Sequence, residues 1–213
     1  MISILIADDH AIFREGLRQI LEDVPDMAVA GEASSGQEVL EKVSKNDYDL
    51  LLLDIAMPGL SGLETLKLLK NQKPKLRVLV LSMYPEDQYA VRAIKAGAYG
   101  YITKASASEE LIGAIRKISG GGRYISASIA EKLLFNLEPE HDRPLHERLS
   151  DREYQILCLI ARGRTVGEIA EELCLSVKTV STHRTHILEK MRLKTNAELT
   201  NYALKFGLVC LTD

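Results

Sequence analysis

LLLLDIAMPG, residues 50 to 59, decides the fold of the first half of the chain, because four leucines run directly into an aspartate and a Pro-Gly break. A strand that is apolar at every position is buried on both faces, which is typical of parallel sheets covered by helices. Further short aliphatic runs lie at 3–7, 27–31, 77–82 and 98–103. The stretches between them have helical periodicity, so we predict an α/β fold: a doubly wound, five-stranded parallel sheet.

Polar residues collect where these strands end. They are Asp8, Asp9, Asp54, Ser82 and Lys104. The carboxyl ends of parallel strands meet along one edge of a sheet, where α/β proteins bind ligands. A single aspartate there is often only a turn former or a helix cap, but five polar residues at one edge favour a binding site. Three carboxylates need a cation, and such oxygen ligands suit Mg²⁺, while the lysine and serine can bind phosphoryl oxygens.

Composition is that of a globular protein with one or two domains: 213 residues, 46% hydrophobic, 27% charged and a formal net charge of -3. Residues 178–194 carry five basic residues and one acidic residue, which favours a partner that is a polyanion. Cys158, Cys174 and Cys210 lack metal-ligand spacing and are expected to be reduced, buried residues. Without a signal peptide or a membrane-spanning apolar run, the protein is expected to be cytoplasmic.

IADDH, LLLLDIAMPG, VLVLSMY and YGYITK resemble the motifs of the CheY-like receiver domain of response regulators, over residues 1–120. The resemblance implies a flavodoxin-like fold in which Asp54 is phosphorylated by a sensor histidine kinase. It implies that Mg²⁺ is bound by Asp8, Asp9, Asp54 and the carbonyl group of Ala56. It also implies that Lys104 and Ser82 bind phosphoryl oxygens and that Tyr101 is the switch residue.

Two residues near the expected phosphoacceptor predict how long its phosphoryl group lasts. Ala56, two residues after Asp54, has no side chain that could orient a water molecule. Tyr84, two residues after Ser82, is placed to screen the same path. We therefore expect slow hydrolysis. Tyr101 also has a plainer interpretation, as an aromatic residue that only covers the sheet.

Residues 121–148 are predicted to be a linker. The segment follows the glycine-rich SGGG at 119–122, and EPEHDRPLHER from 138 onward is polar with two prolines. Within the linker Ile125, Ile129, Leu133 and Leu137 recur every four residues, which indicates a short helix. We expect this helix to be a spacer that also contacts the receiver domain.

Residues 149–213 are predicted to form a separate all-α domain of four short helices. Helix starts are indicated by the capping boxes Ser150–Glu153, Thr165–Glu168 and Thr195–Glu198, and by Ser176 as a further N-cap. Because only a tight turn separates the second and third helices, the arrangement is a helix-turn-helix.

The third helix, residues 177–192, is predicted to have two different faces. The apolar face carries Val177, Val180, Ile187, Leu188 and Met191, and the opposite face carries Lys178, Ser181, Thr182, Thr185, Glu189 and Arg192. Hydroxyl groups and cations can meet base edges and phosphates in a major groove, although such a face is more often merely solvated. His183 and His186 lack a third ligand at helical spacing, which argues against a metal site.

Residues 149–194 resemble the LuxR-type helix-turn-helix, through LSDRE at 149–153, EIA at 168–170 and VKTV with its following histidine at 177–183. The whole chain thus resembles the NarL/FixJ family of response regulators. The resemblance places Lys178, Ser181, Thr182 and Thr185 toward the DNA groove, and Thr179, His183 and Lys190 at positions of backbone contact or helix packing. It implies promoter DNA as a partner, a homodimer paired through the last helix (196–206) when phosphorylated, and RNA polymerase as a further candidate partner.

The predicted function is that of a regulator and not of an enzyme: phosphorylation of Asp54 controls dimerisation and sequence-specific DNA binding. One alternative is a regulator that acts through protein contacts without phosphorylation, against which the full set of pocket residues argues. The other is a phosphatase with an aspartate nucleophile. Such an enzyme needs an acid two residues after the nucleophile, where this chain has Ala56.

Overall fold

The computed structural model describes residues 1–135 and 144–209, and its contacts divide the chain into two compact units, Met1–Lys132 and Leu133–Asp213. Leu137, Cys210 and the central part of the predicted linker lie outside the described residues. The linker bounds of 121 and 148 remain a prediction. Within the described ranges, no helix combines the length and apolarity needed to cross a membrane.

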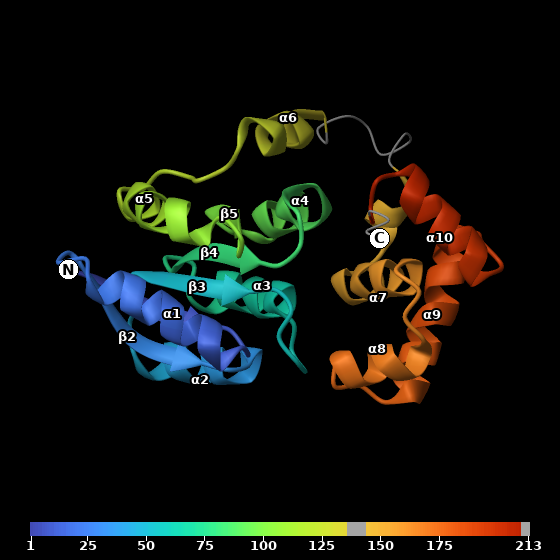
Figure 1. The fold of residues 1–213 in the computed structure, drawn as a ribbon, viewed down its shortest axis with the longest axis horizontal. Coiled ribbons are helices and arrows are strands. Elements are labelled where there is room, and N and C mark those ends of the chain that lie inside the picture. Colours follow the sequence, from blue (N-terminus) through green and yellow to red (C-terminus); the bar gives the residue numbers. More distant parts are fainter. Residues whose placement is uncertain (136–143, 210–213) are drawn as a thin grey trace. The chain divides into compact units, whose positions relative to one another are not determined.

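The N-terminal unit alternates five strands with five helices. The strands are β1 (Ile2–Ala7), β2 (Met27–Ala33), β3 (Leu50–Asp54), β4 (Arg77–Ser82) and β5 (Gly100–Thr103). The helices between and after them are α1 (Ala11–Glu22), α2 (Gly36–Lys45), α3 (Gly62–Gln72), α4 (Glu86–Ala96) and α5 (Ala107–Ser119). All pairings are parallel in the order β2-β1-β3-β4-β5, which confirms the predicted flavodoxin-like sheet (Figure 1).

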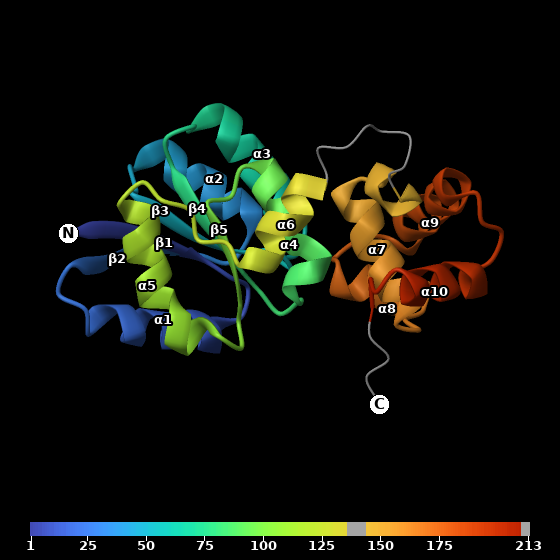
Figure 2. The ribbon, with the colours of Figure 1, turned by 90° about the horizontal axis from the view of Figure 1, so that it is seen from above.

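The leucine run lies at the centre of this sheet, in β3. Figure 2 shows α1 and α5 on one side of the sheet and α2 and α3 on the other. Leu50 and Leu52 belong to the core that packs under α1 and α5, and successive side chains of a strand point to opposite faces. Leu51 and Leu53 are as fully buried as their neighbours. The run is continuous because both of its faces are buried, as predicted.

The chain that follows α5 covers the edge strand β5. Tyr124 pairs in parallel with Gly100, and Ser126 Oγ donates to Glu86 Oε2 of α4 at 2.7 Å. Helix α6 (Ala127–Phe135) begins directly afterwards. The short helix predicted inside the linker is therefore present, and the residues that lead into it contact β5 and α4 of the first unit. The predicted contact of the helix itself stays a prediction.

The C-terminal unit contains a short 3-10 helix and four α-helices within residues 144–209. These are η2 (Leu145–Arg148), α7 (Asp151–Ala161), α8 (Val166–Glu172), α9 (Val177–Met191) and α10 (Asn196–Lys205). They confirm the predicted all-α domain. The 3-10 helix is an element that the sequence did not indicate, and His146 within it contacts the hydroxyl group of Tyr202 in α10 (Nδ1 to OH, 3.1 Å).

The predicted helix starts are found with one difference. Complete capping boxes form at Ser150 and Thr165, and the Ser176 side chain accepts the backbone N–H of Thr179. Thr195 also caps its helix by accepting a backbone N–H. The carboxylate of Glu198, however, accepts the N–H of Lys194 at 2.6 Å, one residue earlier than a capping box requires.

Candidate functional site

Side chains from the ends of β1, β3 and β5 meet at the carboxyl edge of the sheet. Lys104 Nζ lies 2.7 Å from Asp54 Oδ2 and 2.6 Å from Asp8 Oδ2. The side chains of Asp54 and Asp8 are only 1% and 2% exposed. One ammonium group therefore bridges two buried carboxylates, and the topology brings these three predicted site residues together.

This pocket holds more negative than positive charge. Burial raises the pKa of the Asp54 carboxyl, and the charge of Asp8 adds to the rise against the opposing effect of Lys104. Burial disfavours the charged form of Lys104, but its two carboxylate partners outweigh that effect and hold its pKa above the ordinary value. Since two carboxylates share the single positive charge of Lys104, the electrostatics of the pocket favour the binding of a second cation.

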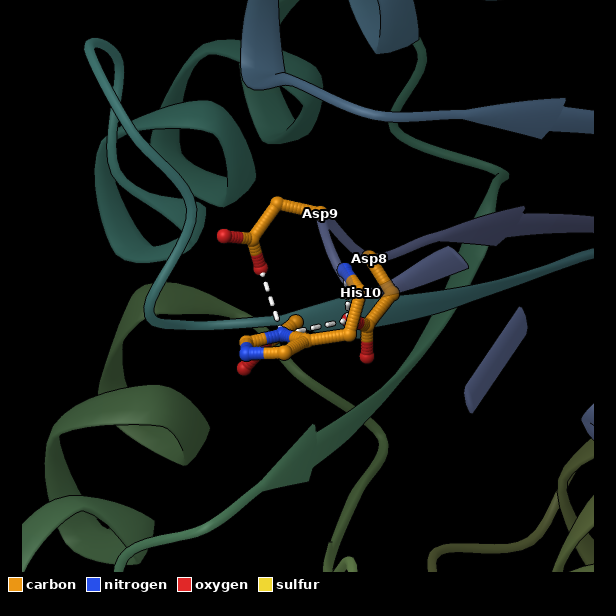
Figure 3. A group of neighbouring side chains, drawn as sticks. Asp8, Asp9 and His10 are labelled. Carbon is orange, nitrogen blue, oxygen red and sulfur yellow. Dashed lines mark hydrogen bonds and ion pairs between the residues drawn. The ribbon is translucent and has the colours of Figure 1, made fainter. Parts of the chain in front are cut away.

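Asp9 and His10 complete a group of possible metal ligands. Ligand atoms of Asp8, Asp9, His10 and Asp54 all lie within 4.8 Å of one another. Figure 3 shows the His10 ring between the two neighbouring carboxylates, with Nδ1 at 2.9 Å from Asp9 Oδ1 and 3.2 Å from Asp8 Oδ1. Three hard oxygen ligands in a pocket with surplus negative charge fit Mg²⁺. The backbone N–H of Ala56 donates to Asp54 Oδ1 at 3.1 Å and helps to orient that carboxylate.

The predicted switch residues form a buried network beside this pocket. Ser82 is fully buried at the end of β4, and its Oγ accepts the backbone N–H of Tyr84 at 3.1 Å. The Tyr101 hydroxyl donates to the carbonyl oxygen of Tyr84 at 2.8 Å. Burial raises the pKa of this hydroxyl, so it remains protonated and able to donate. Tyr101 therefore does more than cover the sheet, because it ties β5 to the loop after β4.

Two residues of the pocket are absent from the predicted set. The sequence did indicate a place in the pocket for His10, because this residue directly follows Asp8 and Asp9 and precedes α1 at the same edge. The sequence contains no such indication for Phe13, since an apolar residue one turn into an amphipathic helix is typical of the core. Its ring centroid lies 4.7 Å from Lys104 Nζ, a cation–π contact that helps to hold the lysine.

The predicted DNA-facing residues of α9 fall into two groups. Lys178, Ser181, Thr182 and Thr185 are exposed, and the two threonine hydroxyls donate to backbone carbonyls one turn earlier. Thr179, His183 and Lys190 have contacts within the domain. The Lys190 ammonium group contacts both carboxylate oxygens of Glu153 at 2.8 and 2.7 Å, which joins α9 to the start of α7.

The faces of α9 differ from the predicted ones at three positions. Val177 was placed on the inner face, but it is the first residue of the helix and is 56% exposed next to the turn. Leu188 is only half-buried. The guanidinium group of Arg184, for which a phosphate or an acidic neighbour was expected, donates from Nε to the side-chain oxygen of Asn196 at 2.6 Å.

A doubly wound domain with a carboxylate and lysine pocket, followed by a helix-turn-helix domain, defines a class: regulators with a receiver domain and a DNA-binding domain. The family described as response regulator receiver domain matches residues 4–116, and bacterial regulatory proteins, luxR family, matches residues 147–203. Response regulator UvrY of Escherichia coli (strain K12) is 37% identical over 209 residues, covering 98% of this chain and 96% of UvrY. Response regulator GacA of Pseudomonas aeruginosa is 39% identical over 211 residues, covering 98% of each chain.

Solved structures of the response regulator RcsB have the same architecture. RcsB of Salmonella typhimurium is 28% identical, with a TM-score of 0.61 over 96% of this chain and 100% of that one. A second structure is that of RcsB from Salmonella enterica serovar Typhimurium bound to promoter rprA in the presence of phosphomimetic BeF3-. It is 27% identical, with a TM-score of 0.65, and the match covers 98% of this chain and 100% of that one. The chain belongs to the NarL/FixJ family and is a two-component response regulator with a receiver domain and a LuxR-type DNA-binding domain.

Proposed function

We propose that Asp54 accepts a phosphoryl group from a sensor histidine kinase, and that this modification controls dimerisation and sequence-specific binding to promoter DNA. The observation that carries the proposal is the Lys104 bridge between the buried carboxylates of Asp54 and Asp8. Such a charge arrangement is unfavourable for stability and well suited to binding a cation and a phosphoryl group.

The residues of the pocket have distinct roles in the transfer. The Asp54 carboxylate attacks phosphorus, the bond from phosphorus to the kinase imidazole nitrogen breaks, and an acyl phosphate forms. Lys104 exchanges a carboxylate contact for a phosphoryl oxygen. Asp8, Asp9, Asp54 and the Ala56 carbonyl group would hold Mg²⁺, which would neutralise the charge of the phosphoryl group when bound.

The Ser82 hydroxyl carries the signal away from the pocket. It now accepts the Tyr84 N–H, and turning it toward a phosphoryl oxygen weakens that bond. Tyr101 moves in response, because its hydroxyl group donates to the carbonyl oxygen of Tyr84. The surface of α4, β5 and α5 then differs between the two states, and that difference supplies the coupling to the DNA-binding domain.

DNA recognition is assigned to the exposed hydroxyl and basic side chains of α9. Lys178, Ser181, Thr182 and Thr185 face the major groove, where the hydroxyl groups meet base edges and the Lys178 ammonium group meets a phosphate that borders the groove. Thr179, His183 and Lys190 support the helix or contact the DNA backbone. The RcsB structure with promoter DNA, and a further one of two RcsB dimers on two parallel DNAs, support a promoter-bound homodimer. Promoter binding places the protein in the cytoplasm, where RNA polymerase is a further candidate partner.

The residues around Asp54 disfavour an enzymatic function. A phosphatase that uses Asp54 needs an acid nearby to protonate the leaving group, and the residue two positions on is Ala56. The DNA-binding relatives also favour a regulator. A regulator that never becomes phosphorylated has no need of two buried carboxylates sharing one lysine.

The test combines intact mass with DNA binding. The native protein and Asp54→Ala are incubated with acetyl phosphate and Mg²⁺, and each is then titrated with duplexes enriched from a random pool. A gain of one phosphoryl group that is absent in the variant, together with tighter DNA binding, supports the proposal. The absence of a mass gain with both acetyl phosphate and a phosphorylated kinase would contradict the proposed phosphorylation of Asp54.

A further inference from the structure

Residues 122–126, here called the strap, lie along the edge of the receiver domain. The Tyr124 N–H donates to the carbonyl oxygen of Tyr99 at 2.9 Å, and Tyr124 pairs in parallel with Gly100 of β5. The Tyr124 hydroxyl donates to Glu110 Oε2 of α5 at 2.6 Å. The strap thus continues the sheet by one pairing and is also fixed to α5.

The far end of the strap is fixed to α4. Ser126 Oγ donates to Glu86 Oε2 at 2.7 Å, and Glu86 is the first residue of that helix. The backbone also passes very close to β5, since a Cβ atom added to Gly100 would lie 2.7 Å from the carbonyl oxygen of Tyr124. The strap therefore contacts α4, β5 and α5 together.

Two of the three anchor points of the strap, those on β5 and α4, adjoin the switch network. Gly100 directly precedes Tyr101, and Glu86 lies two residues after Tyr84, whose carbonyl oxygen accepts the Tyr101 hydroxyl. Burial raises the pKa of Tyr101, and the charges of Asp54 and Glu86 raise it further. A change at the pocket thus reaches the strap through directly contacting residues.

We propose that the strap is a latch that holds the unphosphorylated arrangement, and that phosphorylation of Asp54 releases it and frees the start of the linker. The inference rests on the proposed function. When Ser82 turns toward the phosphoryl group, the loop 83–85 loses the Ser82 bond to the Tyr84 N–H and moves, and Glu86 moves with it. The bond between Glu86 and Ser126 then breaks.

Reciprocity gives the latch a second consequence. If phosphorylation weakens the strap, then weakening the strap must favour the phosphorylated arrangement by the same factor. A strap that merely covered the exposed edge of β5 would be indifferent to the state of Asp54. The two roles therefore make different predictions.

Hydrogen exchange of the full chain tests the release directly. Exchange is followed by mass spectrometry with Mg²⁺ alone and with added beryllofluoride, with Asp54→Asn as the control, while 19F NMR reports bound fluoride. The amides of residues 122–126 should exchange about fivefold faster or more with beryllofluoride, and those of β1 should not change. Bound fluoride with unchanged or slower exchange at 122–126 overturns the latch but leaves phosphorylation intact. No bound fluoride overturns the proposed function and the latch together.

Tyr124→Phe tests the reciprocal effect with the smallest change. It removes only the hydroxyl bond to Glu110, whereas Ser126→Ala would also remove a cap of α6, because the Ile129 N–H donates to Ser126 Oγ. Tyr48→Phe, in the loop before β3, is the matched control. Tyr124→Phe should bind beryllofluoride about fivefold more tightly than the control does. Equal affinities of the two variants would overturn the latch.

Discussion

Lys104 Nζ and Asp54 Oδ2 lie 2.7 Å apart in the interior of the receiver domain, although the two residues are 50 positions apart in the chain. Asp8 shares the same ammonium group, so the pocket buries two carboxylates for one cation. Burial raises the pKa of Asp54 despite its contact with Lys104, so the negative charge of this carboxylate is incompletely compensated. We therefore expect the pocket to lower the stability of the fold, and its binding chemistry explains why it is present.

Asp54→Asn should stabilise the receiver domain at pH 7 by about 1–2 kcal/mol, because it removes an incompletely compensated buried charge. The pKa of Asp54 is raised in the folded state, so the native protein binds this proton more tightly than the unfolded chain does. Its free energy of unfolding therefore falls as the pH rises through the raised pKa, and the advantage of the variant should vanish at lower pH. Urea denaturation in EDTA at several pH values measures both effects, and a variant less stable than native at pH 7 would contradict them.

Lys104→Met should lower the free energy of unfolding by about 3 kcal/mol at pH 7, since it leaves Asp8 and Asp54 without their shared cation. The loss should shrink in acid, where the carboxylates become protonated. Lys73→Met is the matched control, because its ion pair with Asp47 is exposed and should contribute less than about 1 kcal/mol. Equal losses in the two variants would show that the buried bridge has no special role.

Mg²⁺ should raise the melting temperature of the native protein, by an amount equivalent to about 2.7 kcal/mol at a hundredfold excess over Kd. Asp9→Asn should abolish most of this effect, because it removes a ligand that is not needed for the Lys104 bridge. Asp47→Asn, which changes an exposed carboxylate, should retain the full stabilisation by Mg²⁺. Calorimetry with and without EDTA makes the comparison, and a response of Asp9→Asn equal to that of the native protein would exclude Asp9 as a ligand.

Two lysines of α9 should behave differently in DNA binding. Lys178→Ala should weaken binding to all sequences and reduce the salt slope by about one, as expected for the loss of one phosphate contact. Lys190→Met should instead lower the melting temperature of the DNA-binding domain, because it breaks the ion pair with Glu153. Anisotropy titrations at several salt concentrations, combined with thermal unfolding, separate the two cases. An unaltered salt slope in Lys178→Ala would remove that residue from the DNA contacts.

The phosphoryl group on Asp54 should persist for minutes or longer, since Ala56 cannot orient a water molecule and we expect Tyr84 to screen the path. Intact mass measured at intervals after removal of the phosphodonor gives the lifetime. Ala56→Asn supplies a side chain that can bind water and should shorten it. A lifetime of seconds in the native protein would count against this interpretation.

The meeting of Asp8, Asp54 and Lys104 could be predicted because it follows from topology: parallel strands bring their carboxyl ends to one edge regardless of side-chain detail. The capping boxes at Ser150 and Thr165 were equally predictable, since they depend on contacts three residues apart. The faces of α9 were predictable in its middle but not at Val177, where the preceding turn sets the exposure.

Contacts that depend on tertiary approach could not be predicted in the same way. Nothing in the sequence around Gly100 indicates that the backbone of Tyr124 passes against it. The Arg184 partner was also unpredictable, because Asn196 reaches it only once α9 and α10 have docked. His10 is the exception, since its place beside two aspartates was visible in the sequence.

Glu153 has two tasks at once: its carboxylate completes the capping box that begins α7 and also binds Lys190 near the end of α9. Exchanging recognition helices between relatives is an obvious way to rewire promoter choice. In this chain such a transplant would also alter the partner of a residue that starts a different helix. A chimera should therefore carry residues 153 and 190 as a matched pair, or the grafted helix will be inserted into a weakened scaffold.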